Sequence, residues 1–209
     1  MRHPLDVLVV ATRNPAKVKN YKDLLAKYAW RVLDLEELGL SAKADEGGET
    51  SEENAEMKAR FYANQSGWAA FSDDASLYVD FLPPHRQPGV HVRRINGRDE
   101  ASDEQLLAHW ETMLASVPDG ERKGRWHVAF CLASPDGKKR TFSLDLPIVF
   151  FSPSSPQKTP GWPLNSLSGP AGFQKPYSEL SLVEYRRANQ AVDQVVAKTF
   201  QRITSGLSA

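Results

Sequence analysis

Two adjacent carboxylates, Asp73 and Asp74, are the side chains whose type and setting most clearly suggest chemistry. They follow an apolar run at 68–71 (WAAF) that is expected to form a buried strand. Two carboxylates at the end of a buried strand repel each other unless a cation or a proton lies between them. Carboxylate oxygens suit Mg²⁺, which commonly binds substrate phosphates as well. The pair therefore indicates a magnesium site for a phosphorylated substrate.

A second polar group, made of Thr12, Asn14 and Lys17, lies where a predicted strand gives way to a helix that opens with Pro15. Ligands of α/β sheets bind outside the carboxyl ends of strands, and helix N-termini favour anions. Lys17 falls in the first helical turn, where the helix dipole disfavours a cation, and a ligand phosphate would relieve that conflict. In the alternative interpretation Asn14 only caps the helix and Lys17 is solvated. The loop lacks the P-loop pattern.

The segment before the two aspartates contains one more carboxylate and one more ammonium group, those of Glu46 and Lys58. Glu46 and a glycine pair precede Thr50-Ser51-Glu52-Glu53, a capping-box pattern that predicts a helix ending near Gly67. Lys58 lies on this helix. The order of these residues places one more carboxylate and one more ammonium group just ahead of the Asp73 strand.

The elements that must position these side chains alternate between strands and helices in the first half of the chain. Strands are predicted at 6–12, 31–35 and 68–74, and helices at 16–29, 50–67 and 102–114. A Ser-Pro-Asp-Gly turn joins two strand-like runs at 125–133 and 139–151, which is typical of a hairpin. A loop at 152–172 and one last helix at 181–200 follow. The fold class is α/β with a mixed, twisted sheet flanked by helices.

Composition bounds the function. The chain has 209 residues, and its 26 Lys and Arg balance its 26 Asp and Glu. This balance gives no argument for nucleic-acid or membrane partners. The single cysteine, Cys131, lies in an apolar run, is expected in the core, and fits a reducing compartment. The N-terminal apolar stretch is too short for a signal peptide or a membrane span, so a cytoplasmic location is expected.

Four segments in order resemble motifs of the inosine triphosphate pyrophosphatase family. Residues 11–17 resemble (T/S)-x-N-x-x-K, and 46–59 resemble E-x-G-x-T-x-x-E-N-A-x-x-K-A. Residues 73–82 resemble D-D-S-G-L-x-V-x-x-L, and 88–95 resemble P-G-V-Y-S-A-R-Y. The resemblance covers roughly the first two thirds of the chain. It implies a single domain over 1–209 with two lobes, a substrate cleft between them, and a homodimer.

The resemblance also implies roles. Thr12, Asn14 and Lys17 would hold a triphosphate, with Lys58 nearby as a catalytic cation. Glu46, Asp73 and Asp74 would bind Mg²⁺, and Asp74 would orient or deprotonate the attacking water. Attack on the α-phosphorus would give a nucleoside monophosphate and pyrophosphate. Such reactions need positioning and charge neutralisation, which these residue types supply.

The last third departs from the family pattern. Residues 161–166 (GWPLNS) stand where the family has G-F-G-Y-D-P; Trp162 would still stack on a base, and Asn165 replaces an acidic residue. The family's S-H-R motif of the last helix is absent, since the chain reads ANQAV at 188–192. Arg94 matches a family arginine, as a substrate contact or a structural ion pair. His91 is expected to be a packed histidine.

Two functions are compatible with this pattern. The first is a Mg²⁺-dependent pyrophosphatase for a deaminated or otherwise modified purine nucleoside triphosphate. The alternative is a nucleotide-binding sensor or partner protein of the same fold without turnover. Retention of Glu46, Asp73 and Asp74 favours the enzyme, while the altered base-reading segments leave the base and the sugar open.

Overall fold

The structure is a computed structural model that describes residues 5–95 and 100–201. The chain divides into two compact units. Unit 1 comprises 1–74, 128–144 and 191–209, and unit 2 comprises 75–127 and 145–190.

A six-stranded sheet has the order β2-β1-β3-β4-β5-β6. Its strands are β1 (Leu5–Val10), β2 (Ala29–Asp34), β3 (Ala69–Val79), β4 (Lys123–Ala133), β5 (Lys139–Phe150) and β6 (Ser168–Pro170). Strand β1 pairs in parallel with both β2 and β3, whereas β5 and β6 are antiparallel. The sheet is therefore mixed, which confirms the fold class predicted from the sequence. The hairpin prediction is also confirmed, because Gly137 adopts a φ of 85° in the β4–β5 turn.

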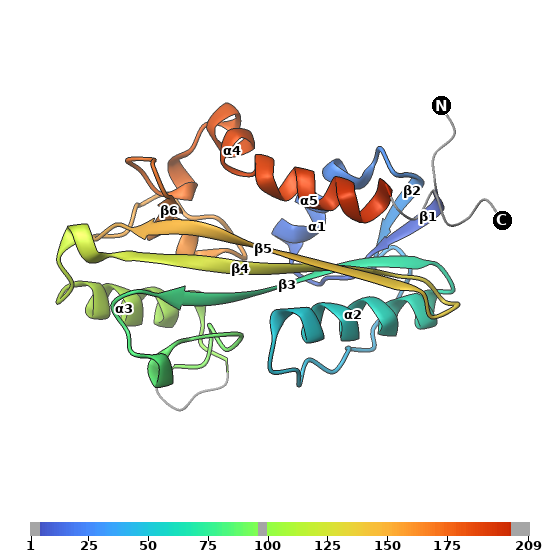
Figure 1. Ribbon diagram of the computed structural model, residues 1–209, viewed down its shortest axis with the longest axis horizontal. Coiled ribbons are helices and arrows are strands. Elements are labelled where there is room, and N and C mark those ends of the chain that lie inside the picture. The colour runs from blue at the N-terminus through green and yellow to red at the C-terminus, as the bar shows by residue number, and fades with distance from the viewer. Residues whose placement is uncertain (1–4, 96–99, 202–209) are drawn as a thin grey trace. The chain divides into compact units, whose positions relative to one another are not determined.

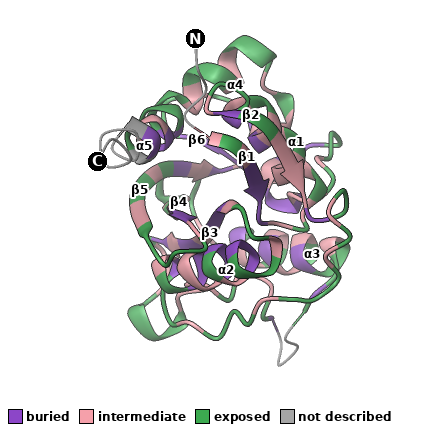
Figure 2. Ribbon diagram, turned by 90° about the vertical axis from the view of Figure 1, so that its right-hand side faces the viewer, coloured by how far each residue is buried: buried purple, intermediate pink, exposed green. Residues whose placement is uncertain are grey.

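Unit 1 contains the helices α1 (Pro15–Leu25) and α2 (Ser51–Ser66) and nearly all of α5 (Gln190–Gln201). Figure 1 shows α2 on one face of the sheet and α1 and α5 on the other. Alanines of α2 pack with small residues of β1, β3 and β4, among them buried Cys131, which confirms its predicted core position. In Figure 2, β1 is largely buried and α2 is buried along one side. Small buried side chains thus fill the interface between α2 and the strands.

Helix α2 begins and ends where the sequence predicts. The Thr50 side chain accepts a hydrogen bond from the Glu53 N–H, and the Glu53 side chain accepts one from the Thr50 N–H. This reciprocal cap satisfies two donors that the first turn leaves free. Gly67 ends the helix at a φ of 73°, a left-handed conformation that favours glycine. Both ends of α2 are fixed, and so is the position of Lys58 along it.

Unit 2 is built around helix α3 (Asp103–Leu114), which begins at the predicted Ser102–Gln105 capping box. Its Trp110 stacks on Phe150 of β5, with ring centroids 5.3 Å apart. The buried core of this unit also includes residues of β3 and of the 3₁₀ helices and loops around them, such as Leu77, Leu164 and Leu167. Four short 3₁₀ helices lie in the described part of this unit: η1 (Pro84–Arg86), η2 (Asp119–Glu121), η3 (Pro163–Ser166) and η4 (Tyr177–Glu179).

Two predictions about the C-terminal third are wrong. The segment 152–172 is not purely loop, because it contains η3 and β6, and β6 adds an edge to the sheet. The last helix is broken into α4 (Leu182–Ala188) and α5. At the break, the Asn189 side-chain amide and backbone N–H both donate to the Tyr185 carbonyl. Asparagine competes for backbone groups in this way, and it ends helices more readily than it continues them.

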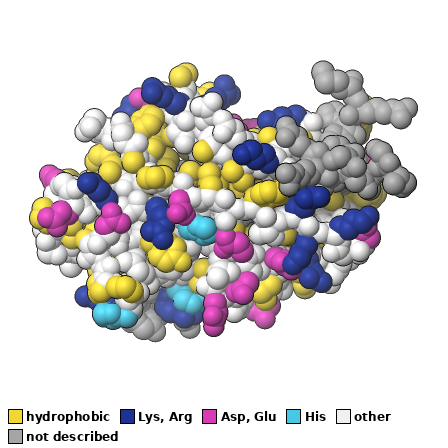
Figure 3. All heavy atoms as spheres, in the orientation of Figure 1, with side chains coloured by type: hydrophobic (Ala, Val, Ile, Leu, Met, Phe, Trp, Pro, Cys, Tyr) yellow, Lys and Arg dark blue, Asp and Glu magenta, His cyan; other side chains and the backbone are white. Residues whose placement is uncertain are grey.

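No helix in the described part of the chain is long and apolar enough to cross a membrane. Figure 3 shows lysine and arginine side chains interspersed with aspartate and glutamate over the visible face. This mixture agrees with the balanced composition and shows no broad single-sign region on that face.

Candidate active site

The loop between β1 and α1 is held by its own polar side chains. The Asn14 Oδ1 atom accepts hydrogen bonds from the N–H groups of Ala16 at 2.9 Å and Lys17 at 3.4 Å. Thr12 Oγ1 accepts from the Asn14 N–H at 3.2 Å. Asn14 is therefore the N-cap of α1, and this capping is compatible with both interpretations of the loop.

Lys17 is not solvated, which is the part of the alternative interpretation that is wrong. Its Nζ lies 2.8 Å from Asp73 Oδ2, and Asp73 is only 3% exposed. The cation disfavoured at a helix start is therefore stabilised by a buried carboxylate of the neighbouring strand β3. The sequence analysis did not predict this ion pair.

The two adjacent carboxylates of β3 have different partners because successive side chains of a strand point to opposite faces. Asp73 lies on the face of α1, as does Phe71, which contacts Tyr21. Asp74 lies on the face of α2, where its Oδ1 is 2.9 Å from Lys58 Nζ. Each carboxylate has a lysine of its own, so their mutual repulsion is offset without a cation between them.

Lys58 joins the second acid to the pair. Its Nζ lies 2.9 Å from Glu46 Oε2 as well as 2.9 Å from Asp74 Oδ1. Five of the predicted side chains thus form two ion-paired groups, one around the Lys17 ammonium and one around the Lys58 ammonium. We refer to the five together as the charged cluster; it consists of Lys17, Glu46, Lys58, Asp73 and Asp74.

Burial and charge act in opposite directions on the titration of this cluster. Burial by itself lowers the pKa of Lys58, but the charges of Asp74, Asp73 and Glu46 outweigh it, so its pKa lies above the ordinary value of 10.5. Burial raises the pKa of Asp74 above its usual 3.8, although Lys58 and Lys17 oppose the shift. Lys58 is therefore positively charged at neutral pH, and Asp74 is a stronger base than an exposed aspartate.

Asn54 is a site residue that the sequence reasoning missed. It is 4% exposed, its Oδ1 accepts from the Gly48 N–H at 2.9 Å, and its Nδ2 lies 3.4 Å from Asp74 Oδ2. Asn54 and Lys58 are four residues apart on α2 and share a face, and this spacing was the available signal. The amide joins the loop after Glu46 to the catalytic candidate Asp74.

Arg13 was also missed. Its guanidinium donates to the carbonyls of Leu40 at 2.8 Å and Ala42 at 2.9 Å, which lie in the segment leading to Glu46. The two loops on either side of the charged cluster are thereby tied to each other. An exposed arginine between Thr12 and Asn14 gives no sequence signal for such a partner.

Three predicted binding residues belong to unit 2. Trp162 is half-buried before η3, and the Asn165 N–H donates to its carbonyl at 3.0 Å. Arg94 is exposed and its N–H donates to the His91 carbonyl at 2.9 Å. The prediction that His91 is packed is wrong, because the chain turns tightly from Pro88 to Arg94 and exposes this side chain.

The charged cluster has the donor set for a hard cation. Among the described residues, no three His, Cys, Asp or Glu side chains come close enough to hold a metal by themselves. Mg²⁺ does not require such a cage, since it is commonly bound by one or two carboxylates, water and substrate phosphate. Asp73 Oδ1 is buried without a hydrogen-bond partner in the described part of the chain. A buried carboxylate oxygen of this kind fits a cation.

Comparison with known proteins places this geometry in a family. Residues 8–147 match the profile of the Ham1 family, a range that contains the whole charged cluster. The chain belongs to the Ham1 family. The family predicted from the sequence motifs is confirmed, because curated relatives of this Ham1 chain carry the name dITP/XTP pyrophosphatase.

The relatives and solved structures cover most of the chain. The Geobacter sulfurreducens dITP/XTP pyrophosphatase is 39% identical over 74% of this Ham1 chain and 75% of its own length. The Mesorhizobium japonicum one is 32% identical over 87% and 84%. A Mycobacterium abscessus nucleoside-triphosphatase, dITP/XTP pyrophosphatase, superposes with a TM-score of 0.67 at 25% identity, over 92% and 97% of the two chains. A HAM1 protein from Coxiella burnetii shares the fold, with a TM-score of 0.71 at 21% identity over 93% and 99%.

Proposed function

We propose that the protein is a Mg²⁺-dependent nucleoside triphosphate pyrophosphatase that releases pyrophosphate and a nucleoside monophosphate. The observation that carries this proposal is the charged cluster, in which two lysines and three carboxylates meet at the end of β1 and on β3. Its family relatives named dITP/XTP pyrophosphatase support the same reaction.

The β1–α1 loop is the proposed triphosphate site. Thr12 and Asn14 shape the loop, and the Lys17 ammonium lies at its edge, in the first turn of α1. Phosphate oxygens would accept hydrogen bonds from the backbone N–H groups at the start of α1 and from the Lys17 ammonium group. Lys17 would then exchange its Asp73 partner for a phosphate. Lys58 would neutralise the negative charge that develops on the phosphate oxygens as the bond between the α-phosphorus and the bridging oxygen breaks.

Asp74 is the proposed general base. Burial raises its pKa, which makes it a better proton acceptor than an exposed aspartate, and its Oδ1 lies 2.9 Å from the Lys58 ammonium group. Asn54 would hold the second carboxylate oxygen and so fix the orientation of the first. In the proposed step, Asp74 takes a proton from water while the water oxygen bonds to the α-phosphorus, and pyrophosphate leaves.

The proposed Mg²⁺ ligands are drawn from Glu46, Asp73 and Asp74: one or two of these carboxylates would bind the ion directly, and water and substrate phosphates would complete its coordination. Glu46 and Asp74 already share one cation, the Lys58 ammonium, and Asp73 offers the unpartnered Oδ1. When bound, Mg²⁺ supplies charge neutralisation of the phosphates.

Membership of the family does not identify the nucleobase that the protein accepts. Trp162 would stack on it, Asn165 would offer both a donor and an acceptor, and Arg94 would contact the substrate. The family's purine-reading histidine and arginine are absent from 188–192, where the chain instead ends α4 with Asn189. A deaminated or otherwise modified purine is the proposed class, and substrate preference is expected to differ from that of inosine triphosphate enzymes.

A cytoplasmic homodimer is the proposed state, from the family resemblance and the single buried Cys131, which forms no disulfide within the chain. Sedimentation analysis of the purified protein tests the dimer; a monomer across micromolar concentrations would contradict it.

The reaction is tested by incubating the protein with Mg²⁺ and a broad panel of ribo- and deoxyribonucleoside triphosphates, with pyrophosphate and phosphate measured separately. We expect equimolar pyrophosphate and monophosphate from at least one member of the panel, and none after chelation of Mg²⁺. Saturable binding without any product over a long incubation would instead indicate the sensor function.

A further inference from the structure

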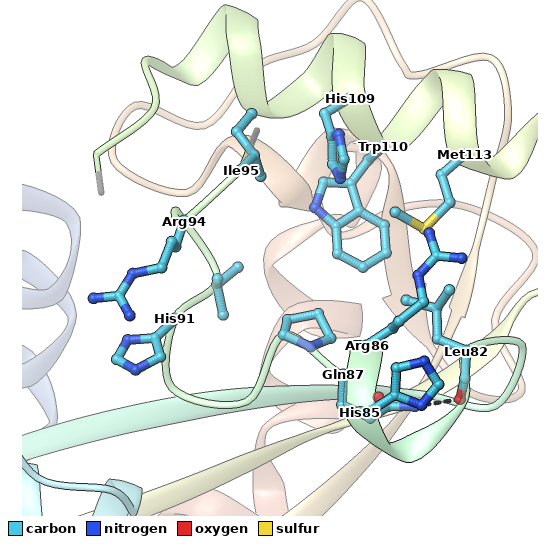
Figure 4. A pocket seen from close by; sticks show the side chains of 12 residues that line it. Leu82, His85, Arg86, Gln87, His91, Arg94, Ile95, His109, Trp110 and Met113 are labelled. Atoms are coloured by element: carbon cyan, nitrogen blue, oxygen red, sulfur yellow. Dashed lines mark hydrogen bonds between the residues drawn. The ribbon is translucent and has the colours of Figure 1, made fainter. Parts of the chain in front are cut away.

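Unit 2 contains a half-open pocket between helix α3 and the segment 82–95, with a volume of about 270 Å³. Figure 4 shows His91 and Arg94 on one side of it and His85 and Arg86 on the other. Helix α3 closes it with His109, Trp110 and Met113.

The wall of this pocket is fixed. Gln87 Oε1 accepts from the Val79 N–H at 2.8 Å, and Gln87 Nε2 donates to the carbonyls of Val79 at 2.8 Å and Leu82 at 2.6 Å. These bonds tie the loop to the end of β3. The pocket is thus largely formed before any ligand enters, as small-molecule sites commonly are.

The indole N–H of Trp110 is an unsatisfied hydrogen-bond donor at the floor of the pocket. The residue is 1% exposed, and its Nε1 is buried without a hydrogen-bond partner among the described residues. Figure 4 shows the indole nitrogen on the side of the ring that faces Ile95, with Arg94 beyond Ile95 and its guanidinium group beside His91. Buried polar groups are nearly always hydrogen-bonded, and an indole N–H only donates, so the missing partner is an acceptor.

The charge of the pocket matches such an acceptor. None of the twelve described residues that line it is acidic, whereas two are arginines and three are histidines. Burial lowers the pKa of His109, which is therefore neutral near pH 7. The two arginines at the exposed rim supply a lasting positive charge. The remaining lining is largely apolar, with Leu82, Val92, Ile95 and Met113.

We propose that this pocket binds a small organic anion that consists of one apolar ring with a single carboxylate or phosphate group. The ring lies against Ile95 and Met113, an anionic oxygen accepts from Trp110 Nε1, and the exposed Arg94 side chain turns inward to bind the same group. The volume of about 270 Å³ is slightly below the usual range of about 300–1,000 Å³ for ligand pockets, which favours a one-ring ligand. The proposal does not rest on the hydrolysis of nucleotides.

The test uses ¹⁵N-labelled full-length protein without Mg²⁺ or nucleotide. The indole N–H signal of Trp110 is assigned as the one lost in Trp110→Phe, and benzoate, phenyl phosphate and benzyl alcohol are titrated in turn. We expect a saturable downfield shift of this signal with an anion and none with the neutral alcohol. A stronger response to phenyl phosphate would identify phosphate monoesters, and a stronger response to benzoate would identify carboxylates.

Arg94→Ala is the decisive variant, because Arg94 is exposed and its loss leaves the core intact. We expect its apparent Kd for the anion to rise about tenfold or more, as for loss of a charge-assisted contact. Arg31→Ala, an exposed arginine of β2 in unit 1, is the charge-matched control and leaves the Kd unchanged. A Trp110 signal that neither anion moves, an equal shift with benzyl alcohol, or unaltered binding in Arg94→Ala would overturn the proposal.

Discussion

Lys58 neutralises two carboxylates at once, Asp74 and Glu46, on the buried side of α2. The carboxylates of the charged cluster outnumber its ammonium groups, so the cluster favours a further cation over a free anion. A triphosphate is therefore expected to bind well only with its magnesium. The proposed reaction is therefore expected to require both lysines and all three acids.

The raised pKa of Lys58 predicts how stability depends on pH. The unfolded chain loses this proton near the ordinary lysine value of 10.5, whereas the folded chain keeps it to higher pH. The stability that Lys58 contributes is therefore complete below the unfolded pKa of 10.5 and is lost as the pH rises through the folded pKa. Urea unfolding at pH 9 and pH 11.5 is expected to show a larger loss for the native protein than for Lys58→Met.

At pH 7 the same variant leaves Asp74 buried without its cation. We expect Lys58→Met to lower the free energy of unfolding by about 3–5 kcal/mol, and Lys58→Arg to lower it less. Equal losses between pH 9 and pH 11.5 in the native protein and in Lys58→Met would show that the Lys58 proton is not held more tightly on folding.

At the scale of elements, local signals predicted most of the fold. Helices α2 and α3 begin at the capping boxes of Thr50 and Ser102, because capping depends only on residues three apart. The break at Asn189 and the short strand β6 escaped prediction, since both depend on tertiary partners. The site shows the same division. The apolar run before Asp73 and Asp74 identified them as candidates, but which lysine pairs with each one depends on the face of the sheet that its side chain occupies.

The loop before α2 leaves no space for a side chain at Gly48. A Cβ there would lie 2.8 Å from both Asn54 Oδ1 and Glu53 Cβ, at the start of α2. We expect Gly48→Ala to displace the loop from Asn54, to lower the free energy of unfolding by about 1–3 kcal/mol, and to reduce kcat. Denaturant unfolding and pyrophosphate release measure the two effects.

Gly120→Ala is the matched control, because a Cβ at Gly120 in η2 meets nothing within 4 Å. Its stability is expected to stay within about 0.5 kcal/mol of the native protein. If Gly48→Ala behaved as Gly120→Ala does, the loop before α2 would not be fixed by its contact with Asn54.

At the scale of the whole molecule, the charged cluster lies entirely in unit 1, and the Ham1 match at 8–147 contains it. The predicted base contacts Trp162 and Asn165 lie outside that match, in unit 2. The residues proposed for the phosphate chemistry thus lie inside the range that the family profile matches, and the proposed base contacts Trp162 and Asn165 follow it.

The C-terminal helix α5 completes unit 1 through one aromatic side chain. Phe200 is 2% exposed, stacks on Tyr28 at 4.2 Å and lies 6.1 Å from Phe71, between ring centroids. We expect Phe200→Ala to lower the free energy of unfolding by about 3–5 kcal/mol, measured by urea unfolding. Val183→Ala, a residue 77% exposed, is the control and is expected to change it by less than about 0.5 kcal/mol. A Phe200→Ala protein as stable as this control would mean that α5 contributes little to unit 1.

The central claim is that water attacks the α-phosphorus with Asp74 as its base. The most direct measurement is hydrolysis of an accepted nucleoside triphosphate in H₂¹⁸O with Mg²⁺, by the native protein and by Asp74→Asn, with mass spectrometry of both products. We predict one ¹⁸O in the monophosphate, none in pyrophosphate, and a rate about 10²–10⁴-fold lower in folded Asp74→Asn. Label in the pyrophosphate, or an undiminished rate in Asp74→Asn, would contradict the claim.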